Sequence, residues 1–219
     1  MLFVFQLMGR NGRPRNDAAR ARAAARGAER GDRGTFDGHE LRPLSERCIA
    51  YAYNGPPLQP PSYNDIHQFF QTPDHVVIFT EMIHEARVVP LDGRAHLPGA
   101  VPQWLGDSRG HWEGDTLVVD TTNFTDKASF NGGLIGKGAS GARFHLVERF
   151  TRVDAETLNY EYTIEDPASF GSHWSAAIPM RKNDAPLYEY ACHEGNYSLS
   201  NVLSGARYQE RVEAEGSQD

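Results

Sequence analysis

The chain has 219 residues, enough for one domain with its own core and too few for two domains of ordinary size. A formal net charge of -7 disfavours nucleic-acid binding, because affinity for the phosphate backbone comes from clustered Lys and Arg. The composition has 39% hydrophobic residues with 21 Gly and 13 Pro, which favours short elements joined by turns. These numbers predict a mainly β protein and leave neutral or cationic small molecules as ligands.

Residues 1–40 are rich in Arg and Ala, and they have no apolar stripe that a helix could bury. We therefore predict a disordered arm over 1–40, in which Asp17–Arg30 is at most transiently helical. The apolar stretch Met1–Met8 is too short to span a membrane, and it lacks the flanks of a signal peptide. No transmembrane segment and no convincing signal peptide are expected.

Residues 41–63 contain several prolines and predict an extended wrap. The strongest β signal follows at Val76–Val89, which we predict as one strand with both faces partly apolar. Such a strand is typical of a sheet covered on both sides or of a barrel with a lined interior. Asp92-Gly93 then predicts a turn, because this pair favours positive φ.

Later segments repeat the pattern of strand and turn. Strands are expected at 115–121, 144–152, 156–164 and 187–192, and a helix at Asn201–Glu213. The glycine-rich stretch 125–142 predicts a mobile loop, which is either a lid or a tolerated insertion. We predict one domain over 41–208, an antiparallel meander closing into a barrel or a strongly curved sheet with little helix, and a polar tail at 209–219.

The chain has two cysteines, Cys48 and Cys192, which are either bridged or two separate buried thiols. Neither lies in a Cys-x-x-Cys motif, and no histidine pair has the spacing of a zinc-binding helix or strand. The glycine-rich stretch has no Gly-Lys-Ser/Thr ending, so nucleotide phosphate binding is not indicated. We expect no metal site and no cofactor, although a metal site assembled from distant strands stays open.

Two places carry candidate catalytic residues. His84 lies on an apolar strand face, where it is either an acid, base or ligand, or a core histidine that a backbone carbonyl satisfies. His193 and Glu194 follow Cys192 in a turn-prone sequence, where side chains project from a strand end. A bridge at Cys192 would hold the backbone beside His193 in place.

Four further residues are candidates for substrate binding. Arg87 belongs to a set of charges that forms either an ion-pair ladder or part of a cavity lining. Asp107 and Arg109 can orient a carboxylate or hydroxyl group, while the simpler alternative is a turn stabilised by its own Asp side chain. Trp112 lies beside them and offers an aromatic face. Ser108 lacks the Gly-x-Ser-x-Gly elbow of serine hydrolases.

Three segments resemble a group of bacterial proteins of unknown function, most of which are exported. The segments are QTPDHVVI from Gln71, WLGDSRGHWEGDTLVV from Trp104 and YACHEGNY from Tyr190, and the likeness covers roughly residues 44–207. The resemblance implies a periplasmic or secreted protein with a signal peptide and a longer N-terminal part, from which this chain departs at its start. The strand pattern is also similar, more coarsely, to that of lipocalin-like barrels.

The residues favour an extracytoplasmic small-molecule enzyme that uses His84, His193 and Glu194 for acid–base chemistry of lyase, isomerase or hydrolase type. Arg87, Asp107, Arg109 and Trp112 would hold the substrate. The alternative is a non-catalytic binding protein in which aromatic residues line an apolar pocket. A third possibility, an interaction module of the cell envelope, would require a broad exposed apolar patch.

Overall fold

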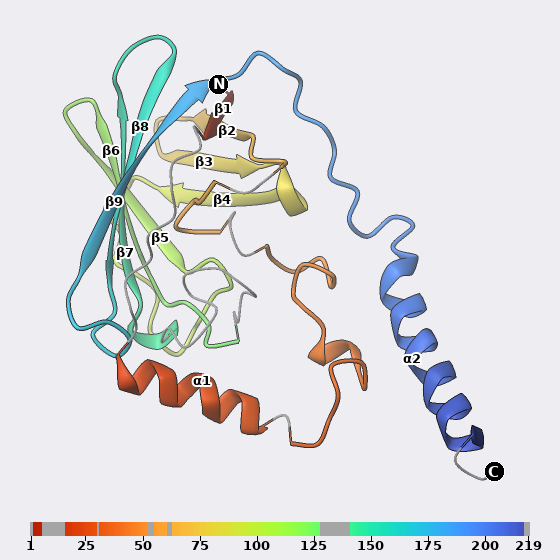
Figure 1. The fold of residues 1–219 in the computed structure, drawn as a ribbon. Coiled ribbons are helices and arrows are strands. Elements are labelled where there is room, and N and C mark those ends of the chain that lie inside the picture. The colour runs from red at the N-terminus through yellow and green to blue at the C-terminus, as the bar shows by residue number, and fades with distance from the viewer. Residues whose placement is uncertain are drawn as a thin grey trace.

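The computed structural model describes residues 2–5, 16–29, 31–51, 55–60, 63–127 and 141–216. Within these residues nine strands form one sheet in the order β4-β3-β2-β1-β9-β8-β7-β6-β5, and every pairing is antiparallel (Figure 1). The strands are β1 (Leu2–Phe5), β2 (His67–Gln71), β3 (His75–Thr80), β4 (Glu85–Pro90), β5 (Asp107–Glu113), β6 (Thr116–Thr122), β7 (His145–Arg152), β8 (Thr157–Glu165) and β9 (Trp174–Lys182). The predicted antiparallel, mainly β fold is confirmed.

The sheet consists of two meanders, β1–β4 and β5–β9, which are joined where β1 pairs with β9. It is strongly curved, because residues from its two halves meet across the interior. The rings of Phe69 on β2 and Phe150 on β7 have centroids 5.4 Å apart. The two edge strands, β4 and β5, come close to each other but are not hydrogen-bonded as a pair. One hydrophobic core fills the concave side of the sheet.

Strand alternation places the core residues. On β8 the predicted apolar face is buried, and its members are Leu158, Tyr160, Tyr162 and Ile164. Leu146 and Phe150 on β7 are also buried, and so is Glu148 between them. The inner face of β7 therefore carries a charge within an otherwise apolar row.

The prediction of one strand over Val76–Val89 is wrong, because the segment is a hairpin. β3 and β4 are joined by the 3-10 helix η2 (Met82–His84), and they pair with Val76 opposite Val89. The turn contains no Gly or Pro, and the β-branched residue Ile83 takes φ 60°. Positive φ is rare for such residues, so the sequence carries no ordinary turn signal here.

The C-terminal strand was predicted in the wrong place. Residues 187–192 are not a strand, and β9 lies earlier, at Trp174–Lys182. Pro179 sits within β9 and weakens its strand signal, because proline cannot donate a hydrogen bond to a neighbouring strand. Most of the predicted glycine-rich loop falls at 128–140, outside the described residues.

The segment predicted to be a disordered arm contains β1 and the helix α1 (Asp17–Glu29). Tertiary contacts account for the helix. The backbone N–H of Asn16 donates to Ser169 O at 2.9 Å, and Arg22 donates to Ala168 O at 2.7 Å, so α1 is attached to the turn between β8 and β9 (Figure 1). Ala19, in the first turn of α1, is fully buried.

Helix α2 (Tyr197–Gly216) stands apart from the sheet and extends through most of the predicted polar tail (Figure 1). Two further 3-10 helices are η1 (His39–Leu41) and η3 (Gly141–Arg143). In the described part of the chain, none of the helices has the length and apolarity needed to cross a membrane.

Candidate functional site

The interior of the sheet holds an ion pair between β4 and β7. The guanidinium of Arg87 donates to both carboxylate oxygens of Glu148, at 2.5 and 3.2 Å, and the two residues are 6% and 0% exposed. Tyr160 Oη donates to the same carboxylate at 2.7 Å and accepts from the backbone N–H of Leu58 at 2.9 Å. Burial next to this carboxylate raises the pKa of Tyr160 well above its usual range.

A buried histidine accompanies the ion pair. His67 on β2 contacts Thr80 Oγ1 through Nδ1 at 3.0 Å. Burial, assisted by the positive charge of Arg87, lowers the pKa of His67 to about 3, so this imidazole is neutral over the physiological range. The proline-rich wrap contacts this cluster through the bond from Leu58 to Tyr160, and Leu58 is buried together with Pro56 and Pro57. Arg87 therefore faces the packed interior, away from the predicted catalytic residues.

The structure brings His84 and His193 together. Their ring centroids are 5.9 Å apart and both residues are exposed. His84 Nδ1 lies 2.9 Å from the carbonyl oxygen of Tyr190, so the chain beside His193 contacts His84 directly. His84 also has φ 44° and follows Ile83 at φ 60°, and two such residues in succession are unusual.

Glu85 completes this group as the first residue of β4. It is half-buried, and burial raises its pKa while the neighbouring His84 partly opposes the shift. Glu81, which precedes η2, forms its hydrogen bonds elsewhere. It is buried, and it accepts hydrogen bonds from Asn64 Nδ2 at 2.5 Å and from the backbone N–H of Tyr188 at 3.1 Å. Glu81 thus anchors the segment that leads to Tyr190.

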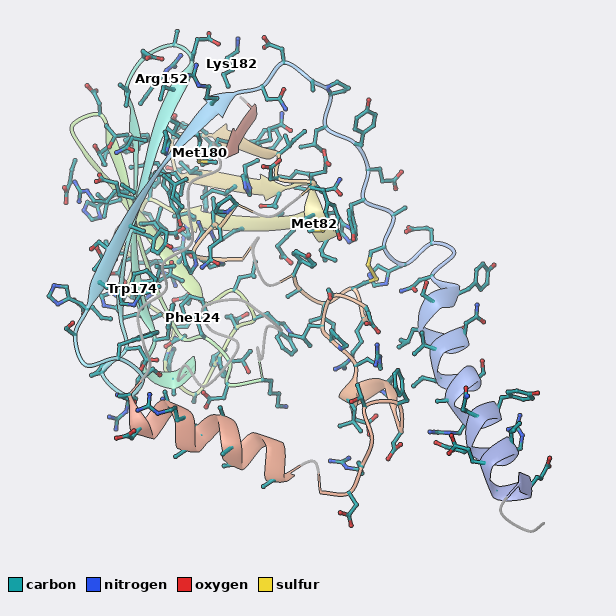
Figure 2. The ribbon with its side chains drawn as sticks, viewed as in Figure 1. Met82, Phe124, Arg152, Trp174, Met180 and Lys182 are labelled. Atoms are coloured by element: carbon teal, nitrogen blue, oxygen red, sulfur yellow. A yellow bond between two sulfur atoms is a disulfide. The ribbon has the colours of Figure 1, made fainter. Side chains whose placement is uncertain are left out.

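A disulfide joins Cys48 to Cys192, with the two Cα atoms 5.7 Å apart (yellow bond in Figure 2). Asn196 Nδ2 donates to Glu46 O at 3.2 Å and ties the same two segments a second time. Beside them runs an open groove of about 430 Å³ that includes Glu194 in its lining. The imidazoles of His84 and His193 are not among the residues that line this groove.

Asp107 and Arg109 belong to a separate network on the outer face of the sheet. Arg109 donates to Asp107 Oδ1 at 2.6 Å, and His96 contacts Asp107 Oδ2 at 3.0 Å. The other nitrogen of His96, Nε2, contacts Asp120 Oδ1 at 2.9 Å. The second oxygen of Asp120, Oδ2, contacts His145 Nε2 at 2.8 Å. The backbone N–H of Leu97 donates to Asp107 as well, at 2.8 Å.

These contacts fasten the connection between β4 and β5, residues 91–106, to the sheet. We call this connection the strap. Burial opposes the ionisation of Asp120, but hydrogen bonds from His145 and His96 prevail and lower its pKa. The same bond to Asp120, with a weaker one to Glu165, raises the pKa of His145. We call this network the clasp; its members are His96, Asp107, Arg109, Asp120 and His145. The predicted pair Asp107 and Arg109 thus belongs to the clasp and is not a neighbour of His84.

Trp112 lies at yet another place, near the β5–β6 turn. It is 45% exposed and borders an open cleft of about 650 Å³. The predicted site residues therefore fall into four groups: His84 with His193, whose chain neighbour Glu194 lines the groove, Arg87 in the interior, Asp107 with Arg109 on the outer face, and Trp112 at the cleft. Within the described ranges, no set of three or more His, Cys, Asp or Glu side chains is arranged to hold a metal ion.

Sequence reasoning missed the partners of these residues. Glu148 had a usable signal, since it alternates with Leu146 and Phe150 on one strand face. His96, Asp120 and His145 had none, because they come from three separate segments that only the curvature of the sheet and the course of the strap bring together.

The fold and interior define an antiparallel β protein built on one strongly curved sheet around an apolar core with a buried ion pair. A crystal structure of a variant of the fluorescent protein UnaG is similar to this chain with a TM-score of 0.32 and 10% identity, over 65% of this chain and 87% of that chain. The likeness is too distant to indicate a function. No family model and no curated protein matches the sequence.

Proposed function

We propose that this protein is an enzyme that uses His84 and His193 for acid–base chemistry on a small polar molecule. The observation that carries the proposal is the contact between His84 Nδ1 and the carbonyl oxygen of Tyr190. A carbonyl only accepts hydrogen bonds, so Nδ1 bears the hydrogen and the neutral ring keeps its lone pair on Nε2. His84 Nε2 is then the base, and its tautomer is set by the backbone.

His193 supplies the second proton carrier. With the ring centroids 5.9 Å apart, a substrate at the pair can lose a proton to His84 Nε2 and receive one from a protonated His193. Both rings are exposed, so each exchanges protons with solvent after turnover. Glu194, the residue after His193, lies in the adjoining groove, where its carboxylate can hold a hydroxyl or amino group of the substrate.

The alternative, a non-catalytic binder with an aromatic pocket, has less support. Tyr160 and Trp174 are buried in the core, whereas Trp104 and Trp112 are exposed on the surface. These aromatic residues therefore do not line a common cavity. The polar surface pair fits proton transfer better than it fits the binding of an apolar ligand.

The test compares three glutamine variants, H84Q, H193Q and H111Q, in assays with p-nitrophenyl acetate, a panel of lactones and a panel of hydroxy acids. His111 is an exposed histidine that contacts Glu113 on the outer face, so H111Q controls for unspecific imidazole catalysis. H84Q and H193Q should each lower turnover by about 10²-fold or more, while H111Q should leave it unchanged. If H84Q and H193Q turn over substrate as fast as H111Q and the parent protein, His84 and His193 are not the catalytic pair.

A second measurement does not depend on the substrate. The nitrogen chemical shifts of neutral His84 should report hydrogen on Nδ1 and a free Nε2, as the contact with Tyr190 requires. If His84 instead carries hydrogen on Nε2, its lone pair faces the carbonyl and the ring cannot act as the proposed base.

We also propose that the protein works outside the cytoplasm, as members of the exported group that it resembles do. The disulfide supports this, since such bonds persist in oxidising compartments. Thiol labelling of the protein from periplasmic and cytoplasmic expression should show protected cysteines only in the periplasmic protein.

We also infer that the curved sheet serves as a barrel-like scaffold, because β1 pairs with β9 and the edges β4 and β5 come close together.

A further inference from the structure

The open cleft beside Trp112 is formed where three strands end and two turns begin. Gln71 closes β2, Trp112 lies near the end of β5, Arg152 ends β7, and the turns after β5 and β7 supply the remaining lining. The full lining is Gln71, Trp112, Gly114, Asp115, Arg152 and Asp154, around about 650 Å³. Figure 2 labels Arg152 at this end of the molecule.

The cleft is remote from the proposed acid–base pair. β3 begins next to the cleft, since its second residue, Val76, pairs with Gln71. From there β3 runs toward η2, which ends at His84. Six strand residues span about 20 Å, which separates the two places by roughly the length of β3. In Figure 2, Met82 of η2 and Arg152 mark these two regions. A ligand in the cleft would therefore not contact His84.

The polar lining offers both hydrogen-bond donors and hydrogen-bond acceptors, and it carries positive as well as negative charge. Arg152 uses its Nε to donate to the backbone oxygen of Asp154 at 3.1 Å, and its terminal nitrogens have no partner among the described residues. Asp154 accepts from the backbone N–H of Glu156 at 2.7 Å, and this bond, with further ones in the turn, lowers its pKa. The side chains of Gln71 and Asp115 likewise have no hydrogen-bond partner within the described ranges.

This combination selects for one chemical class. An anion would meet the carboxylates of Asp115 and Asp154, a cation would meet Arg152, and an apolar ligand would leave all of these groups without partners. A hydroxyl group both donates and accepts, so it can use the carboxylates, the amide and the guanidinium together. A sugar ring adds an apolar C–H face that fits an exposed indole.

We propose that the cleft binds a neutral saccharide, with one sugar ring lying on Trp112 and its hydroxyl groups bonded to Asp115, Arg152 and Gln71. The cleft is open and shallow, which suits one or two rings of a longer chain rather than an enclosed small molecule. This site is separate from the proposed acid–base pair, so the protein would hold a saccharide at one end and act at the other.

The experiment measures binding of maltotriose, cellotriose and tri-N-acetylchitotriose to the full chain by calorimetry, with glucuronic acid as a charged control. The variants are W112A, W112F, D115N and W104A. Trp104 is also exposed, at 39%, and does not line the cleft, so W104A is the matched control. W112A should weaken binding of one trisaccharide by about tenfold or more, W112F by less, and W104A not at all.

Three results would overturn the proposal: no trisaccharide binds at millimolar concentration, W104A weakens binding as much as W112A, or glucuronic acid binds more tightly than the neutral sugars. W112F and D115N keep the test decisive if W112A fails to fold. The variants H84Q and H193Q should bind the sugar normally. A loss of binding in those two would place the saccharide at the imidazole pair and exclude the cleft, whereas a loss of turnover alone would concern only the proposed enzyme.

Discussion

Arg87 and Glu148 are opposite charges that the sheet encloses almost completely. Removing two charges from water costs several kcal/mol per ion, and only close contacts with well-placed hydrogen bonds offset that cost. Here Tyr160 adds a third bond to the carboxylate. The pair therefore makes the interior intolerant of changes at either residue, although it does not by itself make the fold stable.

The variant E148Q should lower the free energy of unfolding by about 3 to 5 kcal/mol, because the charge of Arg87 would be left buried without its counter-ion. Urea unfolding followed by circular dichroism measures the change. E113Q is the control, since Glu113 pairs with Arg149 on the surface and such pairs contribute at most about 1 kcal/mol. Similar losses in both variants would show that Arg87 is solvated.

The buried residue His67 should make the stability of the fold sensitive to acid. Its pKa is about 3 in the folded chain against 6.5 for free imidazole, so the unfolded state binds more protons between these values. Stability should therefore fall as the pH drops below 6.5, by roughly 1.4 kcal/mol per pH unit from this group. The variant H67Q should lose about 2 to 3 kcal/mol less than the parent between pH 6 and pH 4. H39Q, at an exposed histidine, should behave like the parent.

Residue types alone identified some of these positions. His84 and His193 were singled out and do meet, although the predicted place of His84 on an apolar strand face is wrong because the residue lies in a turn. Arg87 was predicted either in an ion-pair ladder with nearby charges or in a cavity lining, whereas its partner Glu148 is 61 residues away. A partner so distant in sequence depends on how the sheet curves, and local patterns do not carry that information.

At the scale of elements, strands with a regular alternation were predictable and turns without glycine were not. β8 shows both alternate faces in its residues, and its burial follows them. The β3–β4 hairpin was invisible because Ile83 and His84 adopt left-handed conformations without the usual residue types. α1 is held by contacts with the turn before β9, and β1 is held by pairing with β2 and β9. Because their own sequences carry no signal for these contacts, they suggested disorder.

The clasp that fastens the strap should respond to pH. His145 has a raised pKa, so its contribution to stability is complete below 6.5 and is lost as the pH rises through the folded-state value. D120N removes the shared acceptor of His96 and His145. It should therefore destabilise more at pH 5.5 than at pH 8.5, with a difference of roughly 1 kcal/mol because the clasp is partly exposed.

Urea midpoints at the two pH values measure this difference. D115N serves as the control, because Asp115 is an exposed aspartate on the neighbouring turn and has no bond to a histidine among the described residues. If D120N costs the same stability at both pH values, His145 gains nothing from its protonation in the folded state.

For the whole molecule, the disulfide is the longest covalent constraint. It closes a loop of 144 residues and holds the segment before α2 against residues 45–48. The double variant C48S/C192S should lose about 4 to 5 kcal/mol of stability, which thermal or urea unfolding measures. The parent protein in reducing buffer should show the same loss, and an unchanged midpoint would mean that the disulfide does not stabilise the fold by restricting the unfolded chain.

The same change separates the two proposed sites. Residues 190 and 193 adjoin the disulfide, so its loss should loosen the His84–His193 pair and lower turnover. None of the described residues that line the Trp112 cleft belongs to that segment, so the cleft should bind saccharide as before at temperatures where the variant stays folded.

The unpaired edges have a consequence for protein engineering. The strap is the backbone connection between the meander β1–β4 and the meander β5–β9. Because β4 and β5 do not pair, cutting the strap breaks no strand pairing of the described sheet. A specific protease site inserted at Gly99 should thus give a nicked protein that keeps its sheet, with the pieces held by β1–β9 pairing and by Cys48–Cys192. On a denaturing gel the halves should separate only after reduction, which makes the chain a natural split reporter of thiol reduction.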